Sequence, residues 1–333
     1  MKVLYAIQGT GNGHLSRARD LIPALLDRGV ALDLLVSGTQ ADLSLPYPVR
    51  YRFKGMSFIF GKQGGVDFWQ TYRKANSFRV REEVRTLPVR EYDLVLNDFE
   101  PVSAWACKLK NIPCIGVSHQ AAVLSPAAPQ PDRKDPVGLF VLRNYAPVSH
   151  QYGFHFQAYE EGMFTPIIGK GIREARISEG WHYTVYLPAY SDARIVSVLS
   201  QVPGVQWEVF SKHNASPFRH GNVQVRPIEH DAFLESIAGC RGVLCAAGFE
   251  TPSETLFLGK KLCVVPMKNQ YEQQCNAVAL SQMGVPVLDG LSADTLPALQ
   301  EWVGQEKALQ VPYPDIAGVV VDRVLEAHAP VFV

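Results

Sequence analysis

The amino-acid sequence predicts an α/β fold with two doubly wound, Rossmann-like domains. Two strand–turn–helix–strand units indicate this, over residues 2–36 and 242–284, because that alternation is typical of a parallel sheet covered by helices. The length of 333 residues is sufficient for two domains that each bury a core. We expect the first domain at residues 1–170, the second at 171–316 and a final helix at 317–333.

Composition argues against several classes of function. The chain has 32 Lys and Arg against 32 Asp and Glu, and this zero net charge does not suggest a nucleic acid or an acidic membrane as partner. No apolar run reaches the roughly 18 residues that a membrane span needs, and because the N-terminus enters a strand directly we expect no signal peptide. The six cysteines form no C-x-x-C pair. Those in apolar runs are interpreted as buried hydrophobic residues in a reducing cytosol.

In the first half, short apolar runs indicate strands, and helical spacing of apolar residues indicates the helices between them. The expected strands are residues 2–7, 31–36, 50–54, 93–96, 114–117, 152–157 and 163–168, and the expected helices are residues 15–27 and about 67–90.

The glycine-rich turn after the first strand allows two interpretations. Its glycines, Gly9, Gly11 and Gly13, follow G-x-G-x-G rather than the G-x-G-x-x-G of dinucleotide-binding folds. Asp33 also lies inside the second strand, not at its end where it could meet a ribose. We therefore expect no nicotinamide or flavin cofactor. His14 follows the turn, either as a functional residue or simply as the start of the helix.

Ionisable residues follow two of the predicted strands. Asp98 and Glu100 follow one strand, and His119 follows the next. Because parallel strands share one carboxyl edge, we expect these side chains and His14 to converge on one cleft. Convergent ionisable groups are candidates for acid–base chemistry. Each residue also has a structural interpretation, as a helix cap or a hydrogen-bonding partner.

An apolar patch lies beside the strand expected at residues 50–54, and a proline-rich loop is expected near the cleft. The loop spans residues 121–135. An apolar patch of this kind is most often part of the core, and the alternatives are an acceptor pocket or a surface that faces a membrane. The last alternative adds peripheral contact with the inner face of the membrane to the expected cytoplasmic location. The patch consists of Met56, Phe58, Ile59, Phe60, Phe68 and Trp69.

The second half has the same alternation of strands and helices. The expected strands are residues 182–187, 206–210, 223–227, 243–247 and 262–265, and the expected helices are residues 192–200, 251–258, 270–283, 293–303 and 317–327.

The turn at Gly248 is a candidate phosphate site. Glycine lets a ligand approach the backbone, and the free N–H groups of the following helix suit an anion. A competing interpretation is a capping box, with Thr251 as N-cap and Glu254 reaching back, which needs no ligand. Polar residues near the start of the next helix are well placed to hydrogen-bond a sugar: Glu272, Gln273 and Asn276.

These spacings resemble the donor half of GT-B glycosyltransferases, above all the MurG-like N-acetylglucosaminyltransferases and the UDP-glucuronosyl/glucosyltransferases. The pattern of those families is roughly G-x-x-[ST]-x-x-E, then G-x-P, then P-x(5)-[DE]-Q-x-x-N-A. It is matched here by Gly248, Thr251, Glu254, Gly259, Pro266, Glu272-Gln273 and Asn276-Ala277. The first loop resembles the amino-terminal glycine loop of MurG-like enzymes, with Gly11, Gly13 and His14 in matching places.

Two positions depart from the family pattern. Lys260-Lys261 stands where the G-x-P proline would be, and Ala246 stands where those families usually carry a His or Arg that touches the phosphate. The segment from Gly169 to Glu174 resembles the start of the MurG donor domain. That resemblance implies that Arg173 supplies the missing positive charge. The alternative is an interdomain surface arginine.

The resemblance implies two domains that face each other across a cleft, with the final helix crossing back to the first. It implies transfer of a sugar from a nucleotide diphosphate, with UDP the expected nucleotide, to a hydroxyl with inversion. No D-x-D pair ends a strand, so we expect no metal. His14 is the favoured base, with Asp98 as second choice. The implied substrate-binding residues are Gly11, Gly13, His119, Arg173, Ile228 (uracil, through main-chain atoms), Gly248, Thr251, Glu254 (ribose), Glu272 and Gln273 (sugar) and Asn276 (loop support).

Two other functions remain open from the sequence. A nucleotide-sugar 2-epimerase of the same architecture would use carboxylates such as Asp98 and Glu100. The second is a non-catalytic protein that binds nucleotide sugars, against which release of UDP in the presence of cell extract would argue. The sequence does not identify the acceptor, for which a lipid-linked molecule and a small molecule are both open. Its expected region, residues 45–70 and 119–138, carries no readable motif.

Overall fold

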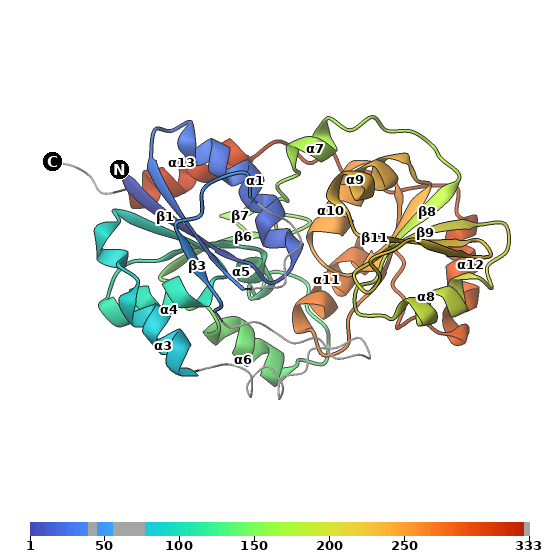
Figure 1. The fold of residues 1–333 in the computed structure, drawn as a ribbon, viewed down its shortest axis with the longest axis horizontal. Helices are drawn as coiled ribbons and strands as arrows, with labels where there is room; N and C mark the ends of the chain where they lie inside the picture. Colours follow the sequence, from blue (N-terminus) through green and yellow to red (C-terminus); the bar gives the residue numbers. More distant parts are fainter. Residues whose placement is uncertain (39–44, 56–76, 330–333) are drawn as a thin grey trace.

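The computed structural model describes residues 1–38, 45–55 and 77–329, and it contains two sheets covered by helices (Figure 1). Both sheets are built mainly from parallel strands, so the predicted α/β fold with two doubly wound domains is confirmed. The two sheets lie side by side along the long axis of the molecule, as Figure 1 shows. The expected apolar patch at residues 56–69 lies outside the described residues.

The first sheet has the strand order β3-β2-β1-β4-β5-β6-β7, and all of its neighbouring strands are parallel. Its strands are β1 (Lys2–Gln8), β2 (Ala31–Ser37), β3 (Tyr51–Phe53), β4 (Leu94–Asp98), β5 (Ile115–Ser118), β6 (His150–Phe154) and β7 (Met163–Phe164). The accompanying helices are α1 (Asn12–Leu26), α3 (Ser77–Thr86), η1 (Val89–Glu91), α4 (Pro101–Lys110), α5 (His119–Val123), α6 (Pro136–Asn144) and α7 (Lys170–Arg173).

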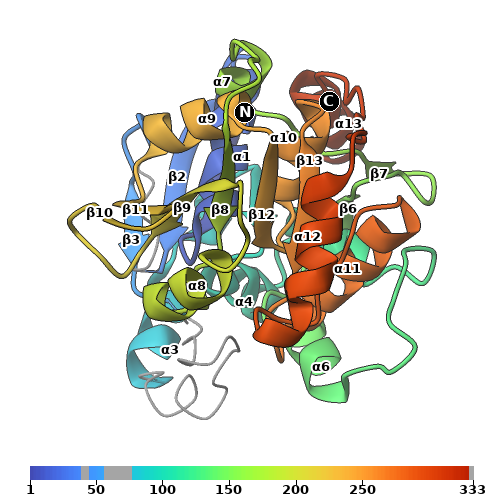
Figure 2. The same ribbon diagram turned by 90° about the vertical axis from the view of Figure 1, so that its right-hand side faces the viewer.

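The second sheet has the order β10-β11-β9-β8-β12-β13, and only the β10–β11 pair among its described strands is antiparallel (Figure 2). Its strands are β8 (His182–Tyr186), β9 (Gln206–Ser211), β10 (Phe218–His220), β11 (Val223–Pro227), β12 (Gly242–Ala246) and β13 (Lys261–Val265). The remaining helices are α8 (Asp192–Leu199), α9 (His230–Gly239), α10 (Glu250–Phe257), α11 (Tyr271–Gln282), η2 (Ala293–Thr295), α12 (Leu296–Gly304) and α13 (Ala317–His328).

Two central strands, β1 and β12, have continuous apolar stretches. Residues 3–7 of β1 and 243–245 of β12 are completely buried. Continuous apolar strands of this kind are typical of parallel sheets that carry helices on both faces. The cysteines lie inside these cores, and all six are free and buried, as the sequence predicts for those in strand-like runs.

The last helix, α13, returns to the first domain. Arg28, just after α1, forms an ion pair with Asp322 of α13, and the hydroxyl of Tyr152 in β6 lies 3.0 Å from Nε2 of His328. Figure 1 shows α13 beside α1, on the side of the molecule that carries the N-terminus. The expected domain boundary at residue 170 falls in α7, between the two sheets. The boundaries themselves stay predictions.

Several elements are shorter than the sequence predicts. The strand expected at residues 163–168 covers only Met163–Phe164. The helix expected at about 67–90 ends at Thr86, in α3 (Ser77–Thr86), and residues 67–76 lie outside the described residues. The helix expected at 293–303 is split into η2 and α12. None of the described helices is long and apolar enough to cross a membrane.

Candidate active site

The two halves of the molecule meet at the carboxyl ends of their central strands. Residues that follow β5 contact residues that follow β12 and β13. His119 stacks on Phe249 with ring centroids 4.0 Å apart, and the Gln120 amide donates to Glu272 at 2.9 Å. His119 of the first half and Glu272 of the second, both predicted from the sequence, therefore lie at one interface.

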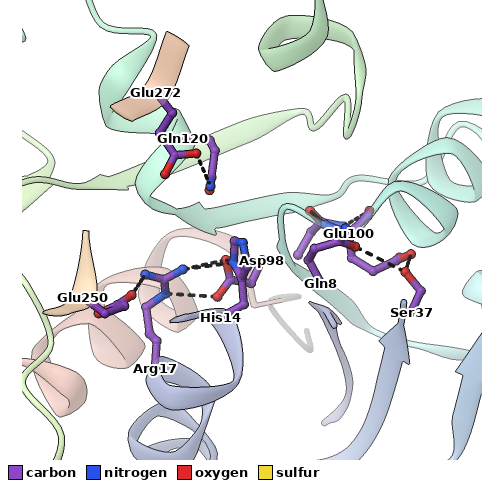
Figure 3. Close-up of polar contacts among 10 residues, drawn as sticks. Gln8, His14, Arg17, Ser37, Asp98, Glu100, Gln120, Glu250 and Glu272 are labelled. Carbon is purple, nitrogen blue, oxygen red and sulfur yellow. Dashed lines mark hydrogen bonds and ion pairs between the residues drawn. The ribbon is translucent and has the colours of Figure 1, made fainter. Parts of the chain in front are cut away.

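His14 forms a dyad with Asp98 at this interface (Figure 3). His14 lies in the first turn of α1 and Asp98 ends β4, and His14 Nδ1 is 2.7 Å from Asp98 Oδ1. Because an ionised carboxylate only accepts hydrogen bonds, His14 donates through Nδ1, and in a neutral imidazole Nε2 then keeps its lone pair. This arrangement gives His14 the tautomer that a general base needs.

Asp98 is held in its charged form by an arginine that the sequence analysis did not single out. Arg17 Nε and Nη2 donate to the two oxygens of Asp98 at 3.0 and 2.9 Å, and both side chains are almost fully buried. Burial alone would raise the pKa of Asp98, but Arg17 and His14 outweigh it and lower that pKa below its usual value. Asp98 is thus a fixed, charged partner of His14 rather than a free base.

Arg17 also reaches the second domain. Its Nη1 donates to Glu250 Oε1, in the first turn of α10, at 2.5 Å (Figure 3). Burial raises the pKa of Glu250 to about 7 although Arg17 acts in the opposite direction. A Cβ atom at Gly13 would lie 3.0 Å from Cγ of Glu250, so the glycine makes this close approach possible.

The turn before α10 is open and has no side-chain cap. The helix begins at Glu250 with Phe249 as N-cap, and no side chain accepts from its first N–H groups. The capping box centred on Thr251 is therefore wrong, because Thr251 already lies inside the helix. A Cβ atom at Gly248 would meet no atom within 4 Å. The geometry leaves room for a ligand against the N-terminus of α10.

Glu254 lies one helical turn after Glu250, and its side chain forms no hydrogen bond with the described residues. Burial, together with the nearby Glu250 and Asp20, raises the pKa of Glu254 to about 8. Its side chain is half-buried, and a carboxyl group without a protein partner is available to bond a ligand hydroxyl. Gly11, in the opposite loop, has φ of +94°, and a Cβ atom there would also meet no atom within 4 Å.

The polar residues of α11 mostly hold the loops of the second domain. Gln273 accepts from the Met267 N–H at 2.9 Å, and Asn276 donates to the Ala247 carbonyl at 3.0 Å. Asn276 thus fixes the turn beside Gly248, whereas the sequence analysis expected it to support the loop of Glu272 and Gln273. Gln273 is only 4 % exposed, so its carbonyl supports the backbone rather than facing a sugar.

His119 connects the two halves. Its Nδ1 lies 2.7 Å from the Phe154 carbonyl and its Nε2 lies 2.8 Å from Asn276 Oδ1. Burial lowers the pKa of His119, and this outweighs the opposing effect of Glu272. Both ring nitrogens are occupied by protein atoms, so the expected substrate contact of His119 is replaced by an interdomain one.

The structure does not bring Arg173 to the site. Its three nitrogens donate to main-chain carbonyls of Ile168, Tyr313 and Pro314, and its guanidinium lies over the ring of Phe257. These carbonyls belong to the segments before α7 and before α13, so Arg173 ties the two crossings between the domains together. The prediction of a phosphate contact at Arg173 is thus not supported by this geometry, and the alternative of an interdomain arginine describes it better.

Ile228 has only part of its backbone free. Its N–H donates to the Ser211 carbonyl at 3.0 Å, which extends the β9–β11 ladder beyond Pro227. A uracil ring bound at this loop would therefore contact the main-chain carbonyl of Ile228 and not its N–H.

Arg17 and Glu250 are the site residues that the sequence reasoning missed. A signal for Arg17 was present, because its position three residues after His14 places both on one face of a helix. Nothing in the sequence marked Glu250, since its partner lies 233 residues away. Among the described residues no group of three or more His, Cys, Asp or Glu side chains is placed to hold a metal ion.

The sequence matches the model of a family described as glycosyl transferase family 1 over residues 1–300, which includes both halves of this site. The chain belongs to glycosyl transferase family 1. No curated protein sequence matches this glycosyltransferase.

Solved glycosyltransferases share the fold of this family 1 member at low sequence identity. SsfS6 from Streptomyces sp. SF2575, solved with thymidine diphosphate, is similar with a TM-score of 0.59 and 15% identity over 98% of this chain and 99% of its own. UGT89C1 of Arabidopsis thaliana, solved with UDP, gives 0.58 and 13% over 98% and 94%. MurG of Acinetobacter baumannii gives 0.53 and 15% over 98% of both chains. The predicted GT-B fold is confirmed by these likenesses.

Proposed function

We propose that this glycosyltransferase moves a sugar from a nucleoside diphosphate, with UDP as the first candidate, to an acceptor hydroxyl. The proposal includes inversion of the anomeric carbon without a metal ion. The observation that carries it is the His14–Asp98 dyad, which Arg17 joins to the first turn of α10.

The leaving group of such a reaction is a diphosphate whose negative charge grows in the transition state. The uncapped N-terminus of α10 and the open backbone at Gly248 suit that charge. Glu254 lies one helical turn further along α10, where we expect it to bond the ribose hydroxyls. Arg17 is the buried guanidinium next to this turn, and it takes the place that the sequence analysis gave to Arg173.

The acceptor hydroxyl must lose its proton as the new bond forms. His14 Nε2 accepts that proton, and the ionised Asp98 stabilises the resulting imidazolium through Nδ1. A single displacement with a base on the acceptor side leads to inversion. The nucleotide in two solved structures of the same fold is UDP or thymidine diphosphate, which supports these two as the nucleotides to test first.

The epimerase alternative is not favoured by the carboxylates it would need. Glu100 accepts hydrogen bonds from the Val102 and Ser103 N–H groups at 2.7 and 2.6 Å. It also accepts from the Ser37 hydroxyl at 2.6 Å (Figure 3). Asp98 is bound by Arg17 and His14. Neither carboxylate is free to move a proton on a sugar.

A thermal-shift screen over UDP, GDP and dTDP, each with and without an attached sugar, tests the donor class. We expect the largest shift with a uridine or thymidine diphosphate. Incubation with UDP-N-acetylglucosamine alone, followed by NMR, should show at most hydrolysis. Appearance of a second nucleotide sugar would support the epimerase, and the anomeric coupling constant of a transferred sugar would test inversion.

A further inference from the structure

Glu250 comes from the donor half of the molecule, yet it contacts the machinery of the acceptor half. We propose that Glu250 is a positioning residue for His14, so that the catalytic dyad has its active geometry only while the two halves are in contact. The proposal rests on the proposed function, in which His14 is the base.

A continuous set of hydrogen bonds joins Glu250 to the base. Glu250 Oε1 accepts from Arg17 Nη1 at 2.5 Å, and Arg17 Nε and Nη2 donate to Asp98 at 3.0 and 2.9 Å. Asp98 Oδ1 accepts hydrogen bonds from both Arg17 Nη2 and His14 Nδ1, the latter at 2.7 Å. Arg17 Nη2 is also only 3.2 Å from His14 Nδ1. A small rotation of the guanidinium therefore changes the hydrogen bond that orients His14.

The charges lead to the same conclusion. Arg17 is one cation placed between two carboxylates, and it is 2% exposed. Because Arg17 also interacts with Glu250, it neutralises less of the Asp98 charge. Asp98 is therefore a stronger hydrogen-bond acceptor for the Nδ1–H of His14. Without Glu250, the guanidinium is neutralised by Asp98 alone and its Nη1 group is left buried without this partner. Asp98 then holds Arg17 more tightly and His14 less tightly.

The backbone of each half positions one side of the contact between Arg17 and Glu250. Gly13 leaves the space that the Glu250 side chain fills, since a Cβ atom there would be 3.0 Å from Cγ of Glu250. Glu250 itself is fixed by the start of α10, beside the turn where the donor diphosphate is proposed to bind. Contact between the two halves thus places both the diphosphate site and the carboxylate of Glu250 beside the His14–Asp98 dyad.

The hydrogen-bonded Nδ1–H proton of His14 gives a test that is independent of the donor and the acceptor. In protein labelled with ¹⁵N-histidine, the wild type should show this proton coupled to Nδ1. Glu250→Ala should broaden or shift that signal, and Glu250→Gln, which still accepts from Arg17 but carries no charge, should shift it less. Asp322→Asn is the matched control, because it changes the ion pair that Arg28 makes just after the same helix.

UDP affinity, measured by calorimetry on the same variants, separates this role from direct donor binding. We expect the dissociation constant for UDP to stay within about twofold of wild type, or to become smaller, because a negative charge is removed. An identical His14 signal in wild type and Glu250→Ala would overturn the coupling. So would an equal change in Asp322→Asn. If wild type binds no nucleoside diphosphate, the proposed function fails, while the NMR result still decides the coupling.

Discussion

Gly248 allows the diphosphate site to be tested by a single methyl group. A Cβ atom at this position would meet no atom within 4 Å, and Gly248 is not one of the glycines with positive φ. Gly248→Ala should therefore fold without strain, with a stability change of about 0.4–1 kcal/mol in the favourable direction. The same methyl group would occupy the space through which a diphosphate approaches the N–H groups of α10.

The expected loss of affinity follows from the hydrogen bonds that the methyl group would displace. One hydrogen bond to a charged group contributes about 1.5–3 kcal/mol. At about 1.4 kcal/mol for each factor of ten, loss of one such bond weakens UDP binding roughly ten- to hundredfold. Uridine has no phosphate and should bind Gly248→Ala as it binds the wild type.

Titration calorimetry with UDP and with uridine measures this difference, and thermal unfolding checks the fold. Gly304→Ala is the matched control, because a Cβ atom there also meets no atom within 4 Å, at the end of α12. Wild-type UDP affinity in Gly248→Ala would refute the argument. Equal weakening of UDP and uridine would also refute it, because that pattern locates the effect away from the phosphates.

Four further substitutions test the rest of the site. His14→Ala should lower turnover by about 10²–10⁴-fold at unchanged UDP affinity, because a base acts on the chemical step; steady-state kinetics at wild-type speed would remove it as the base. Asp98→Asn should also lower turnover, and it should destabilise the fold by about 3–5 kcal/mol because it leaves Arg17 with one carboxylate; an unchanged urea midpoint would contradict the buried ion pair. The pKa of Glu254 is about 8 against an ordinary 4.5, so the folded protein holds a proton that the unfolded chain releases. Stability of the ligand-free protein should therefore fall as pH rises from about 4.5 to about 8, and Glu254→Gln should reduce that fall; melting curves that have the same pH dependence in both proteins would show that Glu254 is not buried. Arg173→Ala should lower the melting temperature and affect UDP and uridine alike; a loss confined to UDP would return Arg173 to the donor site.

The sequence predicted the architecture because its signals are local. The buried strands β1 and β12 are continuous apolar runs, and the glycine turns after them are read directly from the chain. The turn at Gly248 was identified in the same way, because a strand end and the helix after it lie within a few residues. The ribose role of Glu254 came from the family resemblance and stays a prediction. His14 and Asp98 were paired by the rule that parallel strands share an edge.

The relations between the two halves could not be read in this way. The Arg17–Glu250 contact joins residues 233 positions apart, and no spacing rule connects them. Arg173 was misplaced because a short motif suggested a charge near the donor, whereas the crossings between the domains supply three carbonyls for its nitrogens. The capping box failed by a small margin, since α10 starts at Glu250 rather than after Thr251.

The most direct test is a crystal structure of the protein with UDP. The account predicts the two phosphates against the first turn of α10, beside Gly248, and the ribose hydroxyls within hydrogen-bonding distance of Glu254. It also predicts that His14 Nε2 faces the sugar-bearing side of that diphosphate. A nucleotide bound elsewhere, with the turn at Gly248 closed by the protein's own side chains, would contradict the account.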